Sequence, residues 1–393
     1  MKKRLYFIIS VILTSLGGQA VTLNSIMDSI AVNNTELKSK AAEYKSKIAG
    51  IKSTNNLGDT DIDFEYQKGD NINGNKHGFS ISQGFDWPGM YIARSQANKS
   101  LTNAAEYEYR AQKLNILLNA KQICLNIINF NRKIKAQTEI HNNIKQLYTE
   151  YEKGFKHGEI SILDINKLKI ELLNVKQTLD SYITQRQALI EDLTGINGDK
   201  VIYGIELIVT YPEQELQAID TYLNQLTSID PEHNYNNEMI INSGKEVTMA
   251  KMGWMPKFSI GYKYANELGD KFNGFSVGMS LPIFSNRNKV SEAQAAKTAF
   301  IYSGKNEYSS KCANIKKEYS QIVYLKEQIY AYGSVLTDNA NTEILKKALN
   351  GGQISLLDYL MELRYFLEAQ QTLLDLEYEY NSTLTSLNKY QLL

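Results

Sequence analysis

The chain has few of the residues that build compact chemical sites. Its 393 residues include two cysteines, four histidines and five prolines, and lysine plus arginine equals aspartate plus glutamate at 43 each. Two cysteines make no disulfide framework, and the histidines stand in none of the short spacings typical of zinc sites. A balanced charge without a long basic run argues against nucleic acid as a partner. We therefore expect no metal, no other cofactor and no nucleic acid.

Long apolar runs are missing after residue 20. Residues 1–20 have a basic start, an apolar run and small residues at the end, which is the pattern of a secretory signal peptide. The alternative is an N-terminal membrane anchor, but the run is shorter than the roughly 20 residues that a spanning helix needs. We expect an exported protein whose membrane contacts use strands or the surface of a helix.

A twofold repeat is the main positive feature of the sequence. Residues 151–164, YEKGFKHGEISILD, return as residues 345–358, LKKALNGGQISLLD, and corresponding positions such as Gly158 and Gly352 lie 194 residues apart. Each copy joins two long amphipathic segments through a glycine-containing turn. The repeat predicts a first structural unit at 21–199, a joint at 200–212 and a second structural unit at 213–393.

Each half also contains two segments in which apolar and polar residues alternate, namely 61–68 with 78–87, and 257–264 with 275–281. This alternation predicts a β-hairpin with one apolar and one polar face. Strands of about 8 to 10 residues have the length of tilted membrane-spanning strands. The side chains that we predict to contact lipid are Ile62, Phe64, Tyr66, Phe79, Ile81, Phe85, Phe258, Ile260, Tyr262, Phe275, Val277, Met279 and Leu281.

A membrane location constrains how these strands assemble. In lipid every backbone N–H and C=O must be paired, and four strands are too few to close on themselves. Several chains would therefore have to pool their strands. The alternative is an ordinary half-buried sheet covered by helices, but the helices predicted next to the strands are rods that leave the sheet end on.

The remaining segments predict long helices. Residues 21–55 indicate one helix, and residues 91–151 indicate a continuous helix on the order of 90 Å long. Heptad spacing between Ile165 and Leu193 demands a partner helix alongside, which predicts a coiled-coil hairpin. The second half predicts a helix from about Pro212, broken at 230–231, and a second long hairpin.

One catalytic motif matches. Residues 274–278 read GFSVG, the GxSxG pattern of serine hydrolases. That motif requires a strand-to-helix turn at the serine, whereas Ser276 lies inside a predicted strand. Cys312 lies on an apolar helical stripe, which favours a buried packing residue over a redox or metal site. We predict no enzymatic activity.

The charged residues in and next to the turns each allow two interpretations of their role. Asp164 and Asp358 each begin a returning helix, where the helix dipole favours a carboxylate. Alternatively, symmetry in an oligomer would copy Asp358 into an acidic ring that favours cations. Lys156 and His157 in the first turn are either solvated or paired with acidic groups of a partner.

In their order and spacing these features resemble the TolC-like outer membrane efflux family. They are the signal peptide, the repeat over residues 22–390, the hairpins ending in WPG at 87–89 and LPIF at 281–284, and the motifs HGEISILD and GGQISLLD. The resemblance implies a mainly α fold with a small β part. It implies a homotrimer whose pooled strands form a transmembrane β-barrel in the outer membrane, continued through the periplasm by an α-barrel of coiled-coil hairpins.

The resemblance also implies partners. A periplasmic adaptor protein and an inner membrane pump would dock to the turns, in a tripartite efflux or type I secretion system. The metal-efflux, CusC-like branch is one candidate relative. The predicted docking residues are Gly154, Lys156, His157, Gly158, Ser161, Gly351, Gly352 and Ser355.

The resemblance further assigns a periplasmic gate. Asp358 matches the first of the family's two gate aspartates, the second falls on Met361 beside Glu362, and an arginine that locks the gate in some members falls on Ile354. We predict a gate at Asp358, Glu362 and Asp164 whose closed state is held differently. A structural coiled-coil protein of the periplasm, without a pore, is the alternative function.

Overall fold

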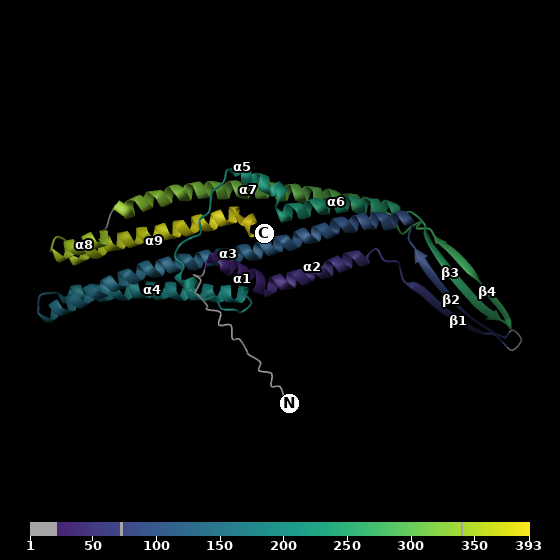
Figure 1. Ribbon diagram of the computed structural model, residues 1–393, viewed down its shortest axis with the longest axis horizontal. Coiled ribbons are helices and arrows are strands. Elements are labelled where there is room, and N and C mark those ends of the chain that lie inside the picture. The colour runs from purple at the N-terminus through teal and green to yellow at the C-terminus, as the bar shows by residue number, and fades with distance from the viewer. Residues whose placement is uncertain (1–21, 71–73, 339–340) are drawn as a thin grey trace, which may run out of the picture. The chain divides into compact units, whose positions relative to one another are not determined.

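The computed structural model describes residues 22–70, 74–338 and 341–393, so the predicted signal peptide lies outside it. These residues form long helices and one small sheet, which confirms the predicted fold class (Figure 1). The elements are α1 (Leu23–Asn33), α2 (Thr35–Ser53), β1 (Thr60–Lys68), β2 (Asn75–Phe85), α3 (Pro88–Lys156), α4 (Ile162–Ile196), η1 (Ile205–Leu207), α5 (Ile219–Ser228), α6 (Pro231–Met252), β3 (Lys257–Glu267), β4 (Asp270–Ser280), α7 (Lys289–Asp338), α8 (Asn341–Asn350), α9 (Leu356–Leu387) and η2 (Lys389–Leu392).

Two helix predictions were wrong at their boundaries. The segment 21–55 is two helices, because the backbone of Asn34 leaves the helical conformation and its side-chain amide donates to the carbonyl of Ile196 at 2.7 Å. The helix expected from Pro212 starts only at Ile219. Tertiary hydrogen bonds fix the intervening backbone instead, including one of 3.2 Å from the Asn388 amide to the carbonyl of Glu215.

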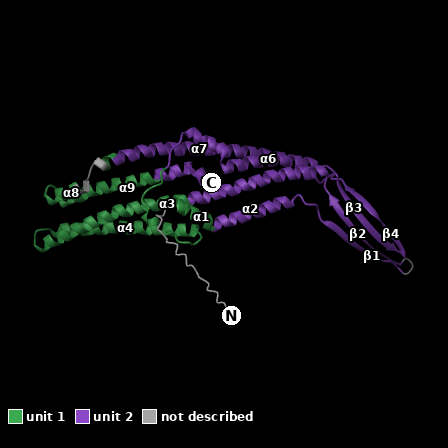
Figure 2. Cartoon of the chain, viewed as in Figure 1, with its two compact units in different colours: residues 1–34, 120–213, 334–378 green, residues 35–119, 214–333, 379–393 purple. Residues whose placement is uncertain are grey.

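The chain divides into two compact units, coloured in Figure 2. Unit 1 comprises residues 1–34, 120–213 and 334–378, and unit 2 comprises residues 35–119, 214–333 and 379–393. Each unit takes segments from both halves of the sequence repeat. The repeat boundaries therefore stay a prediction about sequence and do not coincide with compact units.

The core of unit 1 joins both helical hairpins. It consists of apolar side chains from α3, α4, α8 and α9, including Ile144, Leu168 and Tyr359. Side chains at the heptad positions of α4 belong to this core, as expected for a helix that packs lengthwise against other helices. The predicted coiled-coil hairpin is thus part of a four-helix packing arrangement.

The joint also belongs to unit 1 and is fixed by one buried polar side chain. The amide of Asn131 in α3 donates to the carbonyl oxygens of Ile205 and Ile208 at 2.9 and 2.8 Å. Arg186 of α4 donates to the Asn131 side-chain oxygen at 3.2 Å. These bonds satisfy carbonyl groups that an irregular segment would otherwise leave unpaired.

Unit 2 contains the sheet and a smaller core around Tyr222, Ile322, Leu384 and Leu387.

The two cysteines differ in burial. Cys124, in unit 1, is fully buried, whereas Cys312, in unit 2, is only half-buried, so the prediction of a buried Cys312 was too strong. Among the described helices, none has an apolar stretch of the length and hydropathy needed to cross a membrane.

Candidate functional site

The four strands form one antiparallel sheet in the order β1, β2, β3, β4 (Figure 1). The sequence predicted two hairpins, and the structure unites them because β2 pairs with β3 from Lys76 opposite Glu267 to Phe85 opposite Phe258. Strands β1 and β4 are the outer strands of this sheet. Each therefore has an edge that could pair with a strand of another chain.

The register places the predicted lipid-facing residues on one face of the sheet. Ile62, Ile81, Tyr262 and Phe275 form one row across the strands, and directly opposed residues of an antiparallel sheet share a face. Phe64 is 82% exposed and Phe275 is 87% exposed, so the described residues of unit 2 leave this face largely uncovered. Leu281 alone lies outside the strands, one residue after β4.

Apart from Phe272, the opposite face carries small or polar residues, with Asp61, Ser82, Gly261 and Ser276 in one row. A Cβ atom added at Gly261 would lie 2.8 Å from the carbonyl oxygen of Ile81, so only glycine fits there. Ser276 is in the middle of β4 and not at a strand-to-helix turn. The GxSxG pattern is therefore no nucleophile elbow.

The two helical turns, both in unit 1, close with the same backbone hydrogen bonds. In the first, the N–H of Glu159 donates to the carbonyl of Gly154 at 2.9 Å, and in the second Gln353 donates to Ala348 at 2.9 Å. Gly158 and Gly352 have positive φ angles of 76° and 65°. This is the Schellman motif, whose left-handed residue is normally glycine.

Apolar side chains are exposed around both turns. Phe155, Ile162 and Leu163 flank the first turn, and Leu357 and Met361 follow the second. Lys156, His157 and Gly351 are exposed as well. The turns thus present exposed apolar side chains beside the basic Lys156 and the acidic Glu159.

The two predicted acidic residues make different contacts. Asp358 Oδ2 accepts from the hydroxyl of Ser355 at 2.6 Å and from its N–H at 3.2 Å, which is a reciprocal capping box at the start of α9. These bonds hold the pKa of Asp358 below its ordinary value. Asp164 instead pairs with Lys167 at 3.2 Å.

A family model described as "Outer membrane efflux protein" matches residues 49–199. Those residues span the sheet's first hairpin, α3, the first turn and α4. Over these residues the chain is similar to the outer membrane efflux protein family. The match confirms the family that the repeat and the turn motifs predicted. A comparison with curated proteins finds no match.

Solved structures agree with this efflux family in fold. A membrane protein from Pseudomonas aeruginosa aligns with a TM-score of 0.78 and 14% identity, over 93% of this chain and 91% of that one. The Campylobacter jejuni CmeC outer membrane channel aligns with a TM-score of 0.71 and 19% identity, over 93% and 84%. CusC aligns with a TM-score of 0.74 and 16% identity, over 93% and 91%. Of these three structures, CusC has neither the highest TM-score nor the highest identity, so membership of the CusC-like branch stays a prediction.

The positions that the resemblance assigns to the gate lie in different environments in this chain. Met361 and Glu362 are exposed on the first turns of α9. Ile354, where some members carry a gate-locking arginine, packs against the core of unit 1. An apolar side chain in that place can form no ion pair with Asp358.

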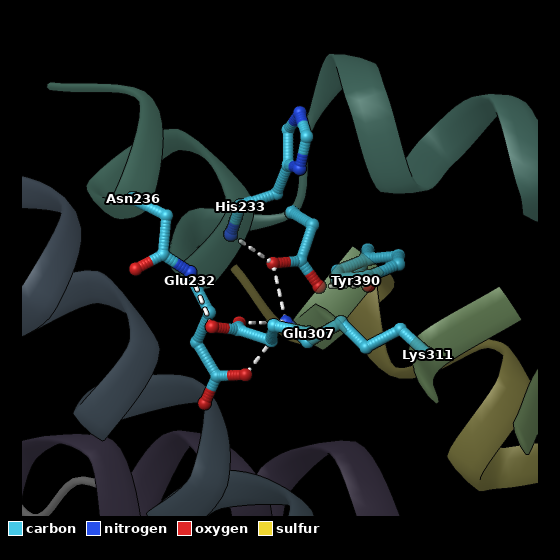
Figure 3. Close-up of polar contacts among 7 residues, drawn as sticks. Glu232, His233, Asn236, Glu307, Lys311 and Tyr390 are labelled. Carbon is cyan, nitrogen blue, oxygen red and sulfur yellow. Dashed lines mark hydrogen bonds and ion pairs between the residues drawn. The ribbon is translucent and has the colours of Figure 1, made fainter. Parts of the chain in front are cut away.

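An ionic cluster around the buried Asp230 in unit 2 was missed by the sequence analysis. Asp230, 2% exposed, caps α6 by accepting from the N–H of His233 at 2.7 Å, and it pairs with Lys311 of α7 at 2.9 Å. Figure 3 shows Lys311 also reaching Glu232 and Glu307, beside Tyr390 of η2.

The hydroxyl of Tyr390 donates to Asp230, which ties η2 to the start of α6. Burial alone would raise the pKa of Asp230, but hydrogen bonds from Tyr390 and Lys311 outweigh burial and lower that pKa. No sequence signal beyond Asp-Pro at 230–231 pointed to this cluster, because its members lie far apart in the chain. Within the described residues no group of three or more His, Cys, Asp or Glu side chains is placed so that it could hold a metal ion.

Proposed function

We propose that this efflux protein is the outer membrane channel of a tripartite efflux or type I secretion system. Three copies form a passive duct across the outer membrane and the periplasm. The duct docks to a periplasmic adaptor protein, and an inner membrane pump supplies the energy. The chain itself performs no catalysis.

The uncovered apolar face of the sheet carries this proposal. Soluble monomers rarely leave a contiguous apolar patch of more than a few hundred Å² in water. Here the face extends over four strands, with Phe64 and Phe275 almost fully exposed at opposite edges. Lipid outside and water inside is the arrangement that gives one apolar and one polar face.

The outer strands explain why several copies are needed. β1 and β4 are antiparallel, so β4 of one copy can pair with β1 of the next and continue the same antiparallel ladder. Four strands per chain leave edges that lipid does not tolerate. Three copies supply twelve strands, which are enough to close the sheet.

The turns of unit 1 supply the docking surface and the gate in this proposal. The exposed apolar residues around the two turns, together with Lys156 and His157, contact the adaptor. Asp358, copied around the axis, forms an acidic ring with Glu362 and Asp164 nearby. Its capping bonds to Ser355 keep it ionised, and Asp358→Ala should lower the cation preference of the channel or raise its basal conductance.

Two measurements test the channel. Light scattering of the protein in detergent should give the mass of a trimer from the outer membrane fraction, and the trimer should conduct ions in a planar bilayer. A monomer from the periplasm without conductance would instead support a structural coiled-coil protein.

A matched pair of variants tests the face assignment. Phe64→Lys places a charge on the apolar face and should destabilise the assembled trimer by about 2 to 4 kcal/mol near the midplane. Glu65→Lys places the same charge on the polar face of the same strand and should leave the trimer intact. Equal trimer yields from the two variants would show that the apolar face is not in lipid.

A further inference from the structure

At the turn end of the sheet, basic side chains lie on the apolar face. The row Tyr66, His77, Asn266, Lys271 follows directly after the row that contains Phe64. Lys68, opposite Asn75, is on the same face one row further out. The apolar face therefore ends in two lysines and a histidine, and Asp70 follows Lys68 by two residues, after the end of β1.

The polar face at the same height carries the acidic groups. Glu65, Glu267 and Asp270 all alternate onto this face. Its lysine, Lys76, pairs with Glu267 at 3.7 Å. The basic residues of the apolar face are thus separated from these carboxylates by the sheet itself.

In the proposed channel the basic rows lie at the outer end of the apolar band, within reach of the lipid headgroups. His77 is eight residues from Phe85 in β2, which is about 27 Å along a strand and about 20 Å in height at a tilt of about 40°. An apolar band is about 25 Å tall, and a lysine side chain extends several ångströms toward the polar layer. In the proposed channel the other end of the sheet leads into the periplasmic helices, so this end meets the outer leaflet.

The two lysines are on opposite edges of the sheet, since Lys68 is in β1 and Lys271 is in β4. When β1 of one copy pairs with β4 of the next, the two lysines come to the same face and the same end of adjacent strands. Like charges that lie directly opposite one another on adjacent strands destabilise the pairing. An anion bound between the two lysines offsets the repulsion between their charges and accepts two charge-assisted hydrogen bonds.

We propose that each junction between copies binds the phosphate group of an outer-leaflet lipid, through Lys68 of one copy and Lys271 of the neighbouring copy. His77 lies in the same row and offers a further hydrogen bond. The acyl chains of that lipid lie along the aromatic rows beneath. The inference rests on the proposed trimer, and it adds a lipid-binding site at each of its junctions.

Native mass spectrometry of the detergent-solubilised protein tests the site with three probes: phosphatidic acid, diacylglycerol and inorganic phosphate. The trimer should bind three molecules of phosphatidic acid, one per junction, and should bind the other two probes far more weakly. The double variant Lys68→Gln/Lys271→Gln should lose at least about tenfold in affinity, because one lysine near an anionic lipid contributes about fivefold.

The matched control is Lys76→Gln, which removes a lysine at the same height from the polar face and should leave the affinity unchanged. If the double variant does not assemble, each single variant should lower the affinity about fivefold. The charge-preserving Lys68→Arg/Lys271→Arg variant should bind as the wild type does.

Three results would overturn the inference. A trimer that binds phosphatidic acid equally with and without the two lysines has no such site, although the channel proposal stands. Binding of inorganic phosphate as tight as that of phosphatidic acid would show a site for free phosphate. A protein that is monomeric in detergent would remove both the junctions and the proposed channel.

Discussion

The two helical turns of unit 1 have the same backbone and different chemistry. Both close through a Schellman motif with glycine in the left-handed position, and both begin the next helix with a serine cap. Yet Asp164 pairs with Lys167, whereas Asp358 turns back to Ser355. The position that corresponds to Lys167 is Met361, which can offer no charge. One side chain three residues away thus decides whether the carboxylate is neutralised.

The returning helices also bury different positions of the repeat. Leu356, at the start of α9, is 6% exposed, whereas its counterpart Ile162 in α4 is 51% exposed. Conversely, Leu168 is fully buried and its counterpart Glu362 is exposed. These equivalent positions therefore have different surroundings, although Ile165 and its counterpart Tyr359 are both buried. The sides of α4 and α9 that face the core of unit 1 thus overlap only in part.

The largest expected effect separates these two helix starts. Leu356→Ala removes a buried side chain and should cost about 2 to 5 kcal/mol of the free energy of unfolding. Ile162→Ala, its matched control, should cost about 0.5 kcal/mol or less because that side chain is already half in water. Denaturant titration measures both. Equal losses would mean that the two helices are buried alike.

The next effect concerns a contact that only the first turn makes. A Cβ atom at Gly154 would lie 2.7 Å from Cγ1 of Ile160, whereas the second turn already has Ala348 at this position. Gly154→Ala should therefore destabilise the first turn by about 1 to 3 kcal/mol, despite the better helix propensity of alanine.

The control for this contact is the same substitution in an Ile160→Ala background. There the clash is gone, so alanine at position 154 should stabilise the helix by up to about 1 kcal/mol. Hydrogen exchange of the amides at the end of α3 reports the difference. A loss of the same size in both backgrounds would show that Ile160 is not the cause.

A smaller effect distinguishes the two serine caps. Ser355 both accepts from and donates to Asp358, whereas Ser161 accepts only from the N–H of Leu163 at 3.1 Å. Ser355→Ala should cost about 1 to 2 kcal/mol, and Ser161→Ala about 0.5 to 1 kcal/mol. Amide exchange in the first turn of each helix measures the losses, and the reverse order would contradict the capping box.

The smallest effect is on proton binding. Hydrogen bonds from Ser355 lower the pKa of Asp358, so folding favours its ionised form. The resulting stabilisation is present above the pKa of the unfolded state and is lost as the pH falls through the lower, folded value. Carboxyl NMR titration should show this low pKa, and Ser355→Ala should raise it. An unchanged pKa in that variant would remove the hydrogen bonds as its cause.

Much of this protein follows from the sequence because the determining signals are local. Strict alternation fixes which side of each strand is apolar, and the constant offset of the repeat locates both turns from residues that lie next to one another. Positive φ at Gly158 and Gly352 is likewise a local requirement of the turn. Fold class, family and the two faces of the sheet were therefore predictable.

The tertiary structure decided what depends on residues far apart in the chain. It united two hairpins through the pairing of β2 with β3, and it gave Leu356 and Ile162 opposite surroundings. It also brought Lys311 and Tyr390 together around the buried Asp230. Periodicity reports which side of an element is apolar, but only packing determines which other element covers that side.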